Sequence, residues 1–481
     1  MADTDRILDE LKAIVGEQYV IHKPEDLIVY EYDGSVDKAT PTAVVVAGST
    51  EEVSEVVKLS RRYNEPIVAR GAGTGLSGGA IPQKGGIVLS LTRMKRILEV
   101  DVENRIAVVE PGLVNIHLSD HVAQYGLYYA PDPSSQKTCT LGGNVAENAG
   151  GPHCLAYGVT TNHVLGMEVV LGDGSVQWFG GKTRETGGYD LRGIMIGSEG
   201  TLGFVTKIIV RLLKKPESVK TLLAVFKELD HASAAVSGII AAGIVPAAIE
   251  MMDDLCIQAA EAAVGAGYPE NAGAVLLVEI DGMDEAVEEE VAEVESVCNE
   301  FDPMEIRTAT DPSERERLWA GRKGVLGALG RLAPNYLLVD GTVPRTKLVE
   351  VLSRIKGLSE ESGYPIANLL HAGDGNLHPS ILFDERKPGD TEAILKIGGE
   401  ILKICVEAGG VLSGEHGIGL EKQEYMPFMF TDDDLEAMAR LKPAFDTRDL
   451  LNPAKIFPTG ASCNEIAFSG AVSRAGPDAW I

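Results

Sequence analysis

The chain has 481 residues, of which 44% are hydrophobic and 24% are charged, a balance typical of a globular protein with more than one domain. Its 43 Lys and Arg residues against 71 Asp and Glu residues give a formal net charge of −28, which argues against partners such as nucleic acid or an anionic membrane surface. No apolar run reaches membrane-spanning length and the N-terminus lacks a signal-peptide pattern, so we expect no integral membrane segment and a cytoplasmic protein, free or held at a membrane by a partner.

The first predicted elements form a βαβ unit. Residues 41–48 (PTAVVVAG) have the pattern of a strand, 51–64 (EEVSEVVKLSRRYN) have helical spacing, and 66–70 (PIVAR) form a short strand that leads into glycines. A further strand follows, and then a hairpin that turns at Glu103-Asn104. From about residue 218, strands alternate with longer helices, which predicts a second, α+β domain. The ordered chain is expected to close with LNPAKIF, followed by a loose tail.

The segment RGAGTGLSGGA (70–80) formally matches the GxGxxG pattern of dinucleotide-binding Rossmann folds. A true fingerprint opens a helix, whereas Pro82, two more glycines and a strand follow here, so we reject the Rossmann interpretation. The exposed N–H groups of such a loop can still form an anion cradle suited to a pyrophosphate. The alternative is a flexible surface loop. Two further glycine clusters, TLGGNVAENAGG (140–151) and GSEGTLGFVT (197–206), would suit a large, flat cofactor.

A candidate metal site lies in ANLLHAGDGNLHPSILF (367–383), which has the form of two strands around Asp374-Gly375. A two-residue turn there would place His371 directly opposite His378, close enough for two imidazoles to bind one ion. Glu415, in the glycine-flanked segment VLSGEHGIG (411–419), offers a third ligand. A set of two histidines and one glutamate leaves an open position and suits Zn²⁺, Mn²⁺, Fe²⁺ or Co²⁺. A chance pairing of two structural histidines is the alternative.

The six cysteines are far apart and show no spacing typical of cluster ligands: Cys139, Cys154, Cys256, Cys298, Cys405 and Cys463. They are expected to be reduced thiols. An iron–sulfur cluster needs closely grouped thiolates, so any cluster in this system is expected in another subunit.

Eight segments in this order resemble the FAD-linked oxidases of the vanillyl-alcohol-oxidase type, and within them the glycolate oxidase flavoprotein subunit and the D-lactate and D-2-hydroxyglutarate dehydrogenases. They are RGAGTGLSGGA, PDPSS, TLGGNVAENAGG, YGVT, GSEGTLG, HAGDGNLH, GEHGIG and LNPAKIF. The resemblance implies an α+β fold: a two-subdomain FAD-binding domain (1–216), a ferredoxin-like cap or substrate domain with the metal site (217–420), and a C-terminal segment (421–481) that returns to the FAD domain before the tail.

The resemblance also implies which residues bind FAD. The pyrophosphate would lie on the glycine loop, on Arg70, Gly71, Gly73, Thr74, Gly75, Leu76 and Ser77. The flavin would be lined by Pro131, Ser134, Ser135, Gly142, Asn144, Asn148, Gly150 and Gly151. The third cluster would add Glu199, Gly200 and Val205, near the adenine, and the C-terminal motif would add Asn452. Ala72 stands where many relatives have glycine, which changes little. The glycine loop has no histidine, so the FAD is expected to be non-covalent.

For catalysis, the resemblance implies a divalent metal on His371, His378 and Glu415, with His416 as the general base. It implies oxidation of a 2-hydroxy acid by hydride transfer to flavin N5. Arg322 would bind the substrate carboxylate, and Arg317, Lys323 and Arg331 are alternatives on the same predicted helix. Asn376 would either bind substrate or stabilise the hairpin turn.

The expected substrate is a short monoacid, D-lactate or glycolate. Relatives that act on longer diacids tend to carry a basic residue just before the segment seen here as YLLVDGTVP (336–344), and this chain has Leu337 and Leu338 instead. The resemblance implies that electrons pass to an iron–sulfur subunit or an electron-transferring flavoprotein. D-2-hydroxyglutarate oxidation, and a flavin electron-relay subunit without its own substrate, are the alternatives within the family. An iron oxygenase with the same metal ligands and an alcohol or ether-lipid flavoenzyme of the same fold are the rival classes.

Overall fold

The computed structural model describes residues 2–183, 187–269 and 271–458, so the tail expected to be loose and Cys463 lie outside the described residues. The chain forms two compact units, each built from several segments. Unit 1 comprises Met1–Ala149, Val159–Lys214 and Glu415–Ile481, and unit 2 comprises Gly150–Gly158 and Lys215–Gly414. The sequence-based domain limits, 216/217 and 420/421, stay predictions. They differ from these divisions by a few residues and do not include the short segment of unit 2 at 150–158.

The first sheet of unit 1 contains the predicted βαβ element, which is confirmed. Its strand order is β1-β2-β4-β3, and β2, β4 and β3 are parallel. The strands are β1 (Val20–Ile21), β2 (Ala43–Val46), β3 (Ile67–Arg70) and β4 (Ile87–Ser90). The helices beside them are α1 (Ala2–Val15), α2 (Pro24–Leu27) and α3 (Thr50–Tyr63). Helix α3 begins where the hydroxyl of Ser49 accepts a hydrogen bond from the backbone of Glu52, and it ends at Asn64 in the left-handed region.

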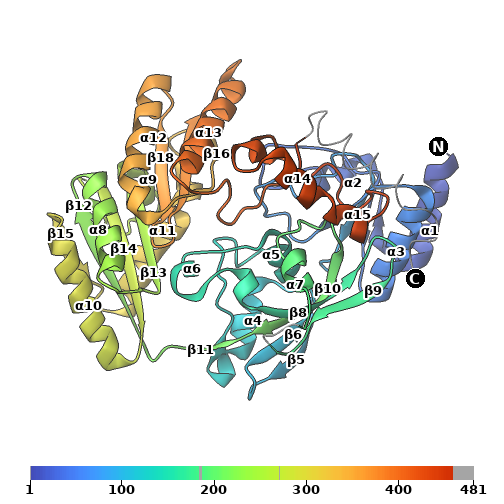
Figure 1. Ribbon diagram of the computed structural model, residues 1–481, viewed down its shortest axis with the longest axis horizontal. Coiled ribbons are helices and arrows are strands. Elements are labelled where there is room, and N and C mark those ends of the chain that lie inside the picture. Colours follow the sequence, from blue (N-terminus) through green and yellow to red (C-terminus); the bar gives the residue numbers. More distant parts are fainter. Residues whose placement is uncertain (1, 184–186, 270, 459–481) are drawn as a thin grey trace. The chain divides into compact units, whose positions relative to one another are not determined.

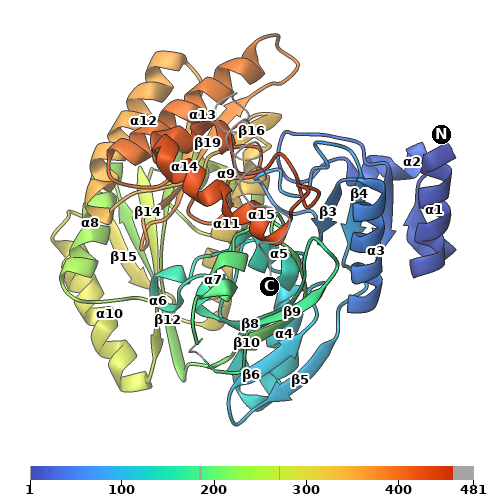
Figure 2. The same ribbon diagram turned by 45° about the vertical axis from the view of Figure 1, so that its right-hand side comes forward.

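The second sheet of unit 1 is antiparallel, with strand order β5-β6-β10-β8-β9. Its strands are β5 (Ile97–Asp101), β6 (Ile106–Val109), β8 (Val164–Val170), β9 (Val176–Gly180) and β10 (Phe204–Arg211). The other elements of the unit are α4 (Asn115–Val122), β7 (Leu127–Tyr128), α5 (Leu141–Glu147), α7 (Leu191–Met195), β11 (Leu213–Lys214), α14 (Asp432–Ala439) and α15 (Leu441–Phe445). Val170 and Phe204 of this sheet pack into the same core as α1 and α3, so the two sheets share helix α3 (Figures 1 and 2).

The C-terminal segment of unit 1 returns to the first sheet. Leu451 lies beside Ile67 of β3 as a parallel bridge, the N–H of Ile67 donates to Leu450, and the N–H of Asn452 donates to Ile67. The LNPAKIF motif therefore extends the edge of the sheet that leads into the glycine loop.

Unit 2 is built on one large antiparallel sheet with strand order β15-β12-β14-β13-β18-β19-β16, and β17 pairs with β19. The strands are β12 (Ser218–Phe226), β13 (Ala248–Asp253), β14 (Ala274–Gly282), β15 (Glu305–Thr308), β16 (Asn335–Leu338), β17 (Gly341–Thr342), β18 (Ile366–His371) and β19 (Asn376–Phe383). The helices are α6 (Cys154–Tyr157), α8 (Leu229–Ala241), α9 (Asp254–Val264), α10 (Asp284–Asn299), α11 (Pro312–Leu329), α12 (Leu348–Ser362) and α13 (Asp390–Glu407).

Alternation along the strands separates the two faces of this sheet. Leu223, Met252 and Leu369 face one core with α9 and α11, whereas Met251 points to α8 on the other face. Helix α8 in turn packs against α10 and α12 (Figure 1). Residues that alternate in step with Met252 and Leu369, such as Glu250 and His371, therefore lie on the α9 and α11 face.

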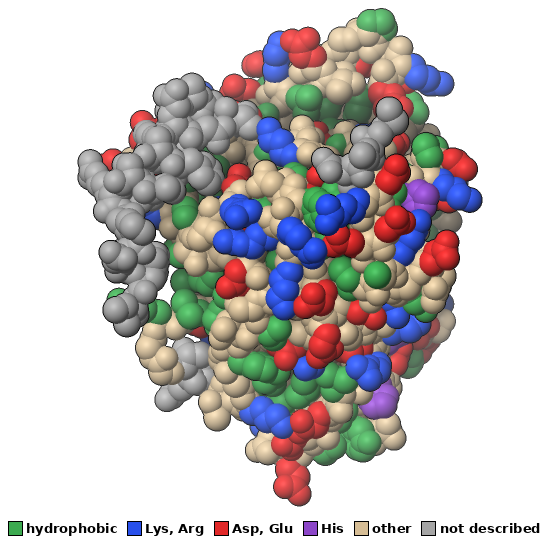
Figure 3. Space-filling model, turned by 90° about the vertical axis from the view of Figure 1, so that its right-hand side faces the viewer, with side chains coloured by type: hydrophobic (Ala, Val, Ile, Leu, Met, Phe, Trp, Pro, Cys, Tyr) green, Lys and Arg blue, Asp and Glu red, His purple; other side chains and the backbone are tan. Residues whose placement is uncertain are grey.

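Acidic and basic side chains are interspersed with apolar ones on the face of the molecule drawn in Figure 3. Unit 1 has partly exposed ion pairs such as that of Arg62 with Glu10. None of the described helices is long and apolar enough to cross a membrane.

Candidate functional site

The predicted histidine hairpin is present in unit 2, but its register differs from the prediction. The turn has four residues, 372–375, so His371 pairs with Asn376 and His378 pairs with Leu369; the expected direct opposition of His371 and His378 is wrong. Asn376 likewise opens strand β19 and does not lie in the turn. The longer turn is stabilised by a hydrogen bond from the Gly375 N–H to the His371 carbonyl, and Gly375 has a φ of 81°.

The two imidazoles are neighbours despite the changed register. A shift of two residues keeps every side chain on its face of the sheet, so His371 and His378 lie diagonally on one face. Their ring centroids are 5.0 Å apart with an interplanar angle of 88°, and both side chains are buried.

Glu250 is the partner of His371 that sequence reasoning missed. It lies directly opposite His371 in the pairing of β13 with β18, and its Oε1 is 2.8 Å from His371 Nδ1. Its Oε2 forms an ion pair with Nη2 of Arg322. Burial opposes ionisation of Glu250, but the charges of Arg322 and His371 outweigh it and hold the pKa of that carboxyl below its usual range. The signal in the sequence was an acidic residue in the middle of the otherwise apolar run AIEMM (248–252).

Arg322 is buried on α11, and its three predicted alternatives are exposed. Helix α11 begins at Pro312 after Asp311, whose side chain caps two N–H groups. The side chain of Arg322 is 4% exposed, while Arg317, Lys323 and Arg331 lie on the solvent side. The Nε of Arg322 is buried and has no hydrogen-bond partner among the described residues. The guanidinium is therefore held by Glu250 at one edge and keeps a donor for a further partner.

Asp340 fixes the end of unit 2 beside the hairpin. This buried carboxylate accepts hydrogen bonds from the Ser413 hydroxyl at 2.7 Å and from the Gly414 N–H at 3.2 Å. Its other oxygen lies 4.0 Å from His378 Nδ1. A Cβ on Gly414 would lie 2.5 Å from Cγ of Asn376, so only glycine permits this approach. Asp340, too, was missed, and it ends an apolar run, YLLVD.

Glu415 and His416 follow Gly414 directly in the chain and are the first residues of the last segment of unit 1. Both are half-buried. Consecutive Cα atoms are about 3.8 Å apart, so the position of Gly414 limits the position of Glu415. In the next residues, the N–H groups of Ile418 and Gly419 donate to Glu199 Oε1 at 2.8 and 3.1 Å.

The glycine loop of unit 1 follows β3 without a helix, as expected, because residues 71–86 contain turns and bends before β4. Arg70 is 7% exposed, and its Nη1 is buried with no hydrogen-bond partner among the described residues. Burial lowers the pKa of Arg70, and the charge of Asp33 opposes this effect. A Cβ on Gly73, which has a φ of 72°, would collide with the Arg70 guanidinium. A Cβ on Gly71 would collide with Thr140 Oγ1.

The rest of the loop borders a pair of acidic side chains. Thr74, Gly75 and Leu76 are half-buried, and the Ser77 hydroxyl donates to Glu147 Oε2 at 3.4 Å. Burial and the neighbouring acids Glu199 and Asp33 raise the pKa of Glu147 well above its usual range.

Several predicted flavin-lining residues have structural partners of their own. The side-chain amide of Asn115 donates two hydrogen bonds, one to Asn144 Oδ1 at 3.0 Å and one to the Pro131 carbonyl. Asn148 accepts from the Thr161 N–H at 2.9 Å. Gly142 packs on Pro111, which a Cβ would approach to 2.6 Å.

The remaining predicted cofactor residues are divided between the units. Ser134 is exposed and Ser135 half-buried in unit 1, whereas Gly150 and Gly151 belong to unit 2. The Asn452 amide donates to the carbonyls of Gly79 and Glu199 at 2.9 and 2.6 Å, which joins the C-terminal motif to two glycine clusters. Gly200, next to Glu199, has a φ of 69°, and Val205 packs on the core of the second sheet.

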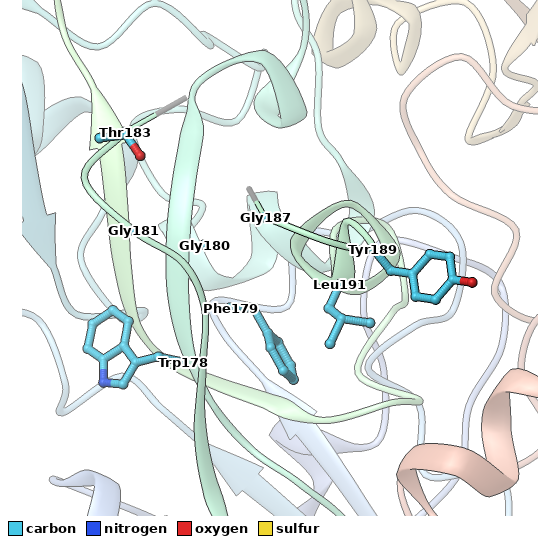
Figure 4. A pocket seen from close by; sticks show the side chains of 8 residues that line it. All are labelled: Trp178, Phe179, Gly180, Gly181, Thr183, Gly187, Tyr189 and Leu191. Atoms are coloured by element: carbon cyan, nitrogen blue, oxygen red, sulfur yellow. The ribbon is translucent and has the colours of Figure 1, made fainter. Parts of the chain in front are cut away.

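A hollow of about 290 Å³ lies elsewhere in unit 1, between β9 and α7. Figure 4 shows its aromatic lining, with Trp178 and Phe179 on β9 and Tyr189 before α7. None of its lining residues is among the predicted site residues, so the hollow is not part of the candidate site.

Comparisons with known proteins match most of the chain in two parts. Residues 41–180 match the model of the "FAD binding domain", and residues 215–456 match that of the "FAD linked oxidases, C-terminal domain". The chain is 45% identical over 468 residues to the glycolate oxidase subunit GlcD of Escherichia coli (strain K12), which covers 97% of this chain and 94% of the relative.

Two further matches extend the comparison. A D-lactate dehydrogenase of Anaerostipes hadrus is 35% identical over 430 residues, covering 87% of this chain and 90% of the relative. The crystal structure of p-cresol methylhydroxylase with bound substrate superposes with a TM-score of 0.80 at 18% identity, covering 94% of this chain and 96% of that one, which shows a shared fold. These matches confirm the expected fold class and the resemblance seen in the motifs. The chain therefore belongs to the family of FAD-linked oxidases and is an FAD-dependent oxidoreductase.

Proposed function

We propose that this protein oxidises a short D-2-hydroxy acid, D-lactate or glycolate, to the 2-oxo acid and passes the electrons to a partner protein. The observation that carries the proposal is the buried group of His371, His378, Glu250 and Arg322 on one face of the unit 2 sheet. Imidazole and guanidinium groups are the side chains that a hydroxy acid with an ionised carboxylate would require. The relatives named glycolate oxidase subunit and D-lactate dehydrogenase support the same substrate class.

The glycine loop fits the diphosphate of FAD. The buried Nη1 of Arg70 lacks a partner among the described residues, and Gly71 and Gly73 bring the backbone where no Cβ would fit. A cationic donor beside exposed N–H groups is the usual recognition of a diphosphate. Arg70 and the residues 71–77 would hold that part of the cofactor. FAD, when bound, supplies the acceptor for the two electrons and the hydrogen of the substrate Cα–H bond.

The hairpin fits a divalent metal. Two buried imidazoles lie face to edge, and a carboxylate lies beside Nδ1 of His371, which is the usual arrangement around a metal-binding histidine. His371 and His378 would bind the ion, with Glu415 as the third ligand. The metal, when bound, supplies a Lewis acid that lowers the pKa of a substrate hydroxyl.

The chain's own groups have separate tasks in this proposal. His416 takes the hydroxyl proton of the substrate on an imidazole nitrogen. Arg322 binds the substrate carboxylate through the Nε edge that Glu250 leaves free. Asn376, which opens β19 beside His378 and whose side chain is buried, donates a hydrogen bond from Nδ2 to an oxygen of the substrate. Together these contacts would orient the Cα–H bond toward its acceptor, and such positioning lowers the barrier of a reaction between two bound partners.

A short substrate is supported by the strand β16. Leu337 and Leu338 are both 8% exposed and pair with Ile381 and Ser380 of β19. These apolar side chains provide no cation for a second carboxylate, which favours a monoacid over D-2-hydroxyglutarate.

The electron acceptor is proposed to be an iron–sulfur subunit or an electron-transferring flavoprotein. None of the five cysteines within the described residues is paired in a disulfide. The relative from E. coli is named as a subunit, which supports a multi-subunit assembly for this chain as well.

The proposal is tested by anaerobic absorbance spectroscopy of the purified, metal-replete protein. D-lactate, L-lactate, glycolate and D-2-hydroxyglutarate are added separately, and we expect D-lactate or glycolate to bleach the flavin. Treatment with a chelator should abolish the bleaching, and added Mn²⁺ or Zn²⁺ should restore it. Bleaching by D-2-hydroxyglutarate alone would replace the substrate assignment. No bleaching by any acid in the metal-replete protein would contradict the proposed activity and favour an electron-relay subunit.

A further inference from the structure

Glu250 joins two groups that the proposed function uses separately. One of its carboxylate oxygens contacts His371 Nδ1 at 2.8 Å, and the other forms the ion pair with Arg322. The side chains of all three residues are 1–4% exposed. One carboxylate therefore holds both a proposed metal ligand and the proposed carboxylate-binding cation.

Glu250 Oε1 lies 2.8 Å from His371 Nδ1, nearer than Arg322 Nη2 at 3.4 Å, so the carboxylate favours one nitrogen of His371 as the one that binds a ligand. An ionised carboxylate only accepts hydrogen bonds, so it favours the His371 tautomer with a proton on Nδ1. That tautomer leaves the lone pair on Nε2. The cross-strand pairing of Glu250 with His371 places the two side chains next to each other on one face of the sheet.

Glu279 on the neighbouring strand β14 provides a comparison within the same sheet. It is 3% exposed and also contacts a histidine and an arginine, His153 and Arg315. It accepts further hydrogen bonds from Trp319 Nε1 at 2.7 Å and Thr221 Oγ1 at 3.0 Å. Neither His153 nor Arg315 is a proposed ligand or substrate contact. The side chains of His153 and Arg315 are 21% and 37% exposed, so only the glutamate of this second contact is buried. A buried glutamate beside a histidine and an arginine is thus not by itself a sign of function.

What distinguishes Glu250 is the identity of its partners. We propose that Glu250 is a positioning residue, which keeps Nε2 of His371 available to a divalent metal and holds the guanidinium of Arg322 in the direction of the substrate carboxylate. This inference rests on the proposed function and deepens it. Carboxylates in this position beside a ligating histidine typically change metal affinity by about 10- to 100-fold when they are removed.

The test compares metal binding by the full-length, FAD-loaded protein and its Glu250→Gln and Glu279→Gln variants after chelation. Zn²⁺ is titrated in competition with a chromophoric chelator. We expect Glu250→Gln to bind Zn²⁺ about 10- to 100-fold more weakly and Glu279→Gln to bind it as the wild type does. Equal Zn²⁺ affinity of Glu250→Gln and wild type would overturn the proposal.

A second measurement needs no variant at Glu250. In the ¹⁵N NMR spectrum of the zinc-loaded wild type, the signals of His371, assigned by their loss in His371→Ala, should show a protonated Nδ1 and a metal-bound Nε2. A protonated Nε2 would contradict the proposed role. If these results hold but no hydroxy acid bleaches the flavin, the proposed function fails while the role of Glu250 at the metal stands. If the acids bleach the flavin but Zn²⁺ affinity does not depend on Glu250, the proposed function stands and the positioning role of Glu250 fails.

Discussion

The glycine loop of unit 1 and the hairpin of unit 2 prepare a binding site in opposite ways. In the loop, residues 70–80, the backbone approaches its neighbours so closely that Gly71 and Gly73 have no room for a Cβ. In the hairpin, residues 366–383, two buried imidazoles lie on one face of a sheet, and each lies near a carboxylate, His371 beside Glu250 and His378 beside Asp340. The loop depends on glycines that have no Cβ, whereas the hairpin depends on the contacts that its histidine side chains make.

This difference determines which substitutions should damage each region. Adding a single carbon should harm the loop, because its neighbours cannot move away without loss of packing. Removing or neutralising one side chain should harm the hairpin, because it leaves a buried partner without compensation.

The largest effect is expected from removing an imidazole of the hairpin. In His378→Ala we expect loss of divalent metal binding and a fall in kcat/KM with D-lactate or glycolate of more than about 100-fold, since a missing ligand costs more than a missing outer carboxylate. Metal content by elemental analysis and steady-state kinetics with an artificial acceptor measure both. FAD content should not change, because the flavin residues of unit 1 are untouched.

His121 provides the matched control for this substitution. It lies exposed at the end of α4, so His121→Ala removes an imidazole without a buried partner. Wild-type metal content in His378→Ala would show that the hairpin histidines serve packing alone. The hairpin would then not be a metal site that depends on its side chains.

A smaller effect is expected from the other buried acid of the unit 2 sheet, Glu279. Burial opposes its ionisation, but His153 and Arg315 outweigh this and lower the pKa of Glu279 from 4.5 to about 2. A depressed pKa contributes stability that is present above pH 4.5 and is lost as the pH falls through 2. The contribution is about 3 kcal/mol for a shift of this size.

Urea unfolding followed by tryptophan fluorescence at several pH values tests this expectation. Wild type should lose about 3 kcal/mol of its free energy of unfolding between pH 4.5 and pH 2 through this group, and Glu279→Gln should lack that part of the slope. Identical slopes would mean that Glu279 is not charged in the folded protein. We expect Glu279→Gln to keep wild-type activity at neutral pH. This result would show that the charge of Glu279 serves stability, in contrast to the proposed role of Glu250.

The sequence predicted the elements of the hairpin better than its register. Alternation of apolar residues around Asp374-Gly375 correctly indicated two strands, but the dipeptide indicated a two-residue turn where the chain forms a four-residue turn. The four-residue turn brings Gly375 against the backbone of Val343. Val343 is distant from the turn in the sequence, so the local sequence does not reveal this contact. The pair of imidazoles was still foreseen, since an error of two residues preserves the face of the sheet.

The buried partners could not be predicted in the same way. Glu250 meets His371 only through the pairing of β13 with β18, and Arg322 reaches both from a helix on that face. Such contacts depend on strand order, which periodicity does not specify. The glycine loop was easier to interpret, because the absence of a helix after it follows from Pro82 and the neighbouring glycines in the local sequence.

The smallest expected effect concerns one added methyl group in the glycine loop. Gly71→Ala places a Cβ against Thr140 Oγ1, and that hydroxyl caps helix α5 by accepting from Gly143 at 3.4 Å. We expect a loss of about 1–3 kcal/mol in the free energy of unfolding and a lower ratio of FAD to purified protein, measured by absorbance. Gly181→Ala is the matched control in the same unit, because nothing lies within 4 Å of its added Cβ. If Gly71→Ala retained FAD and stability as well as Gly181→Ala, close backbone approach would not be what the loop requires. The loop would then be rich in glycine without being sensitive to an added methyl group.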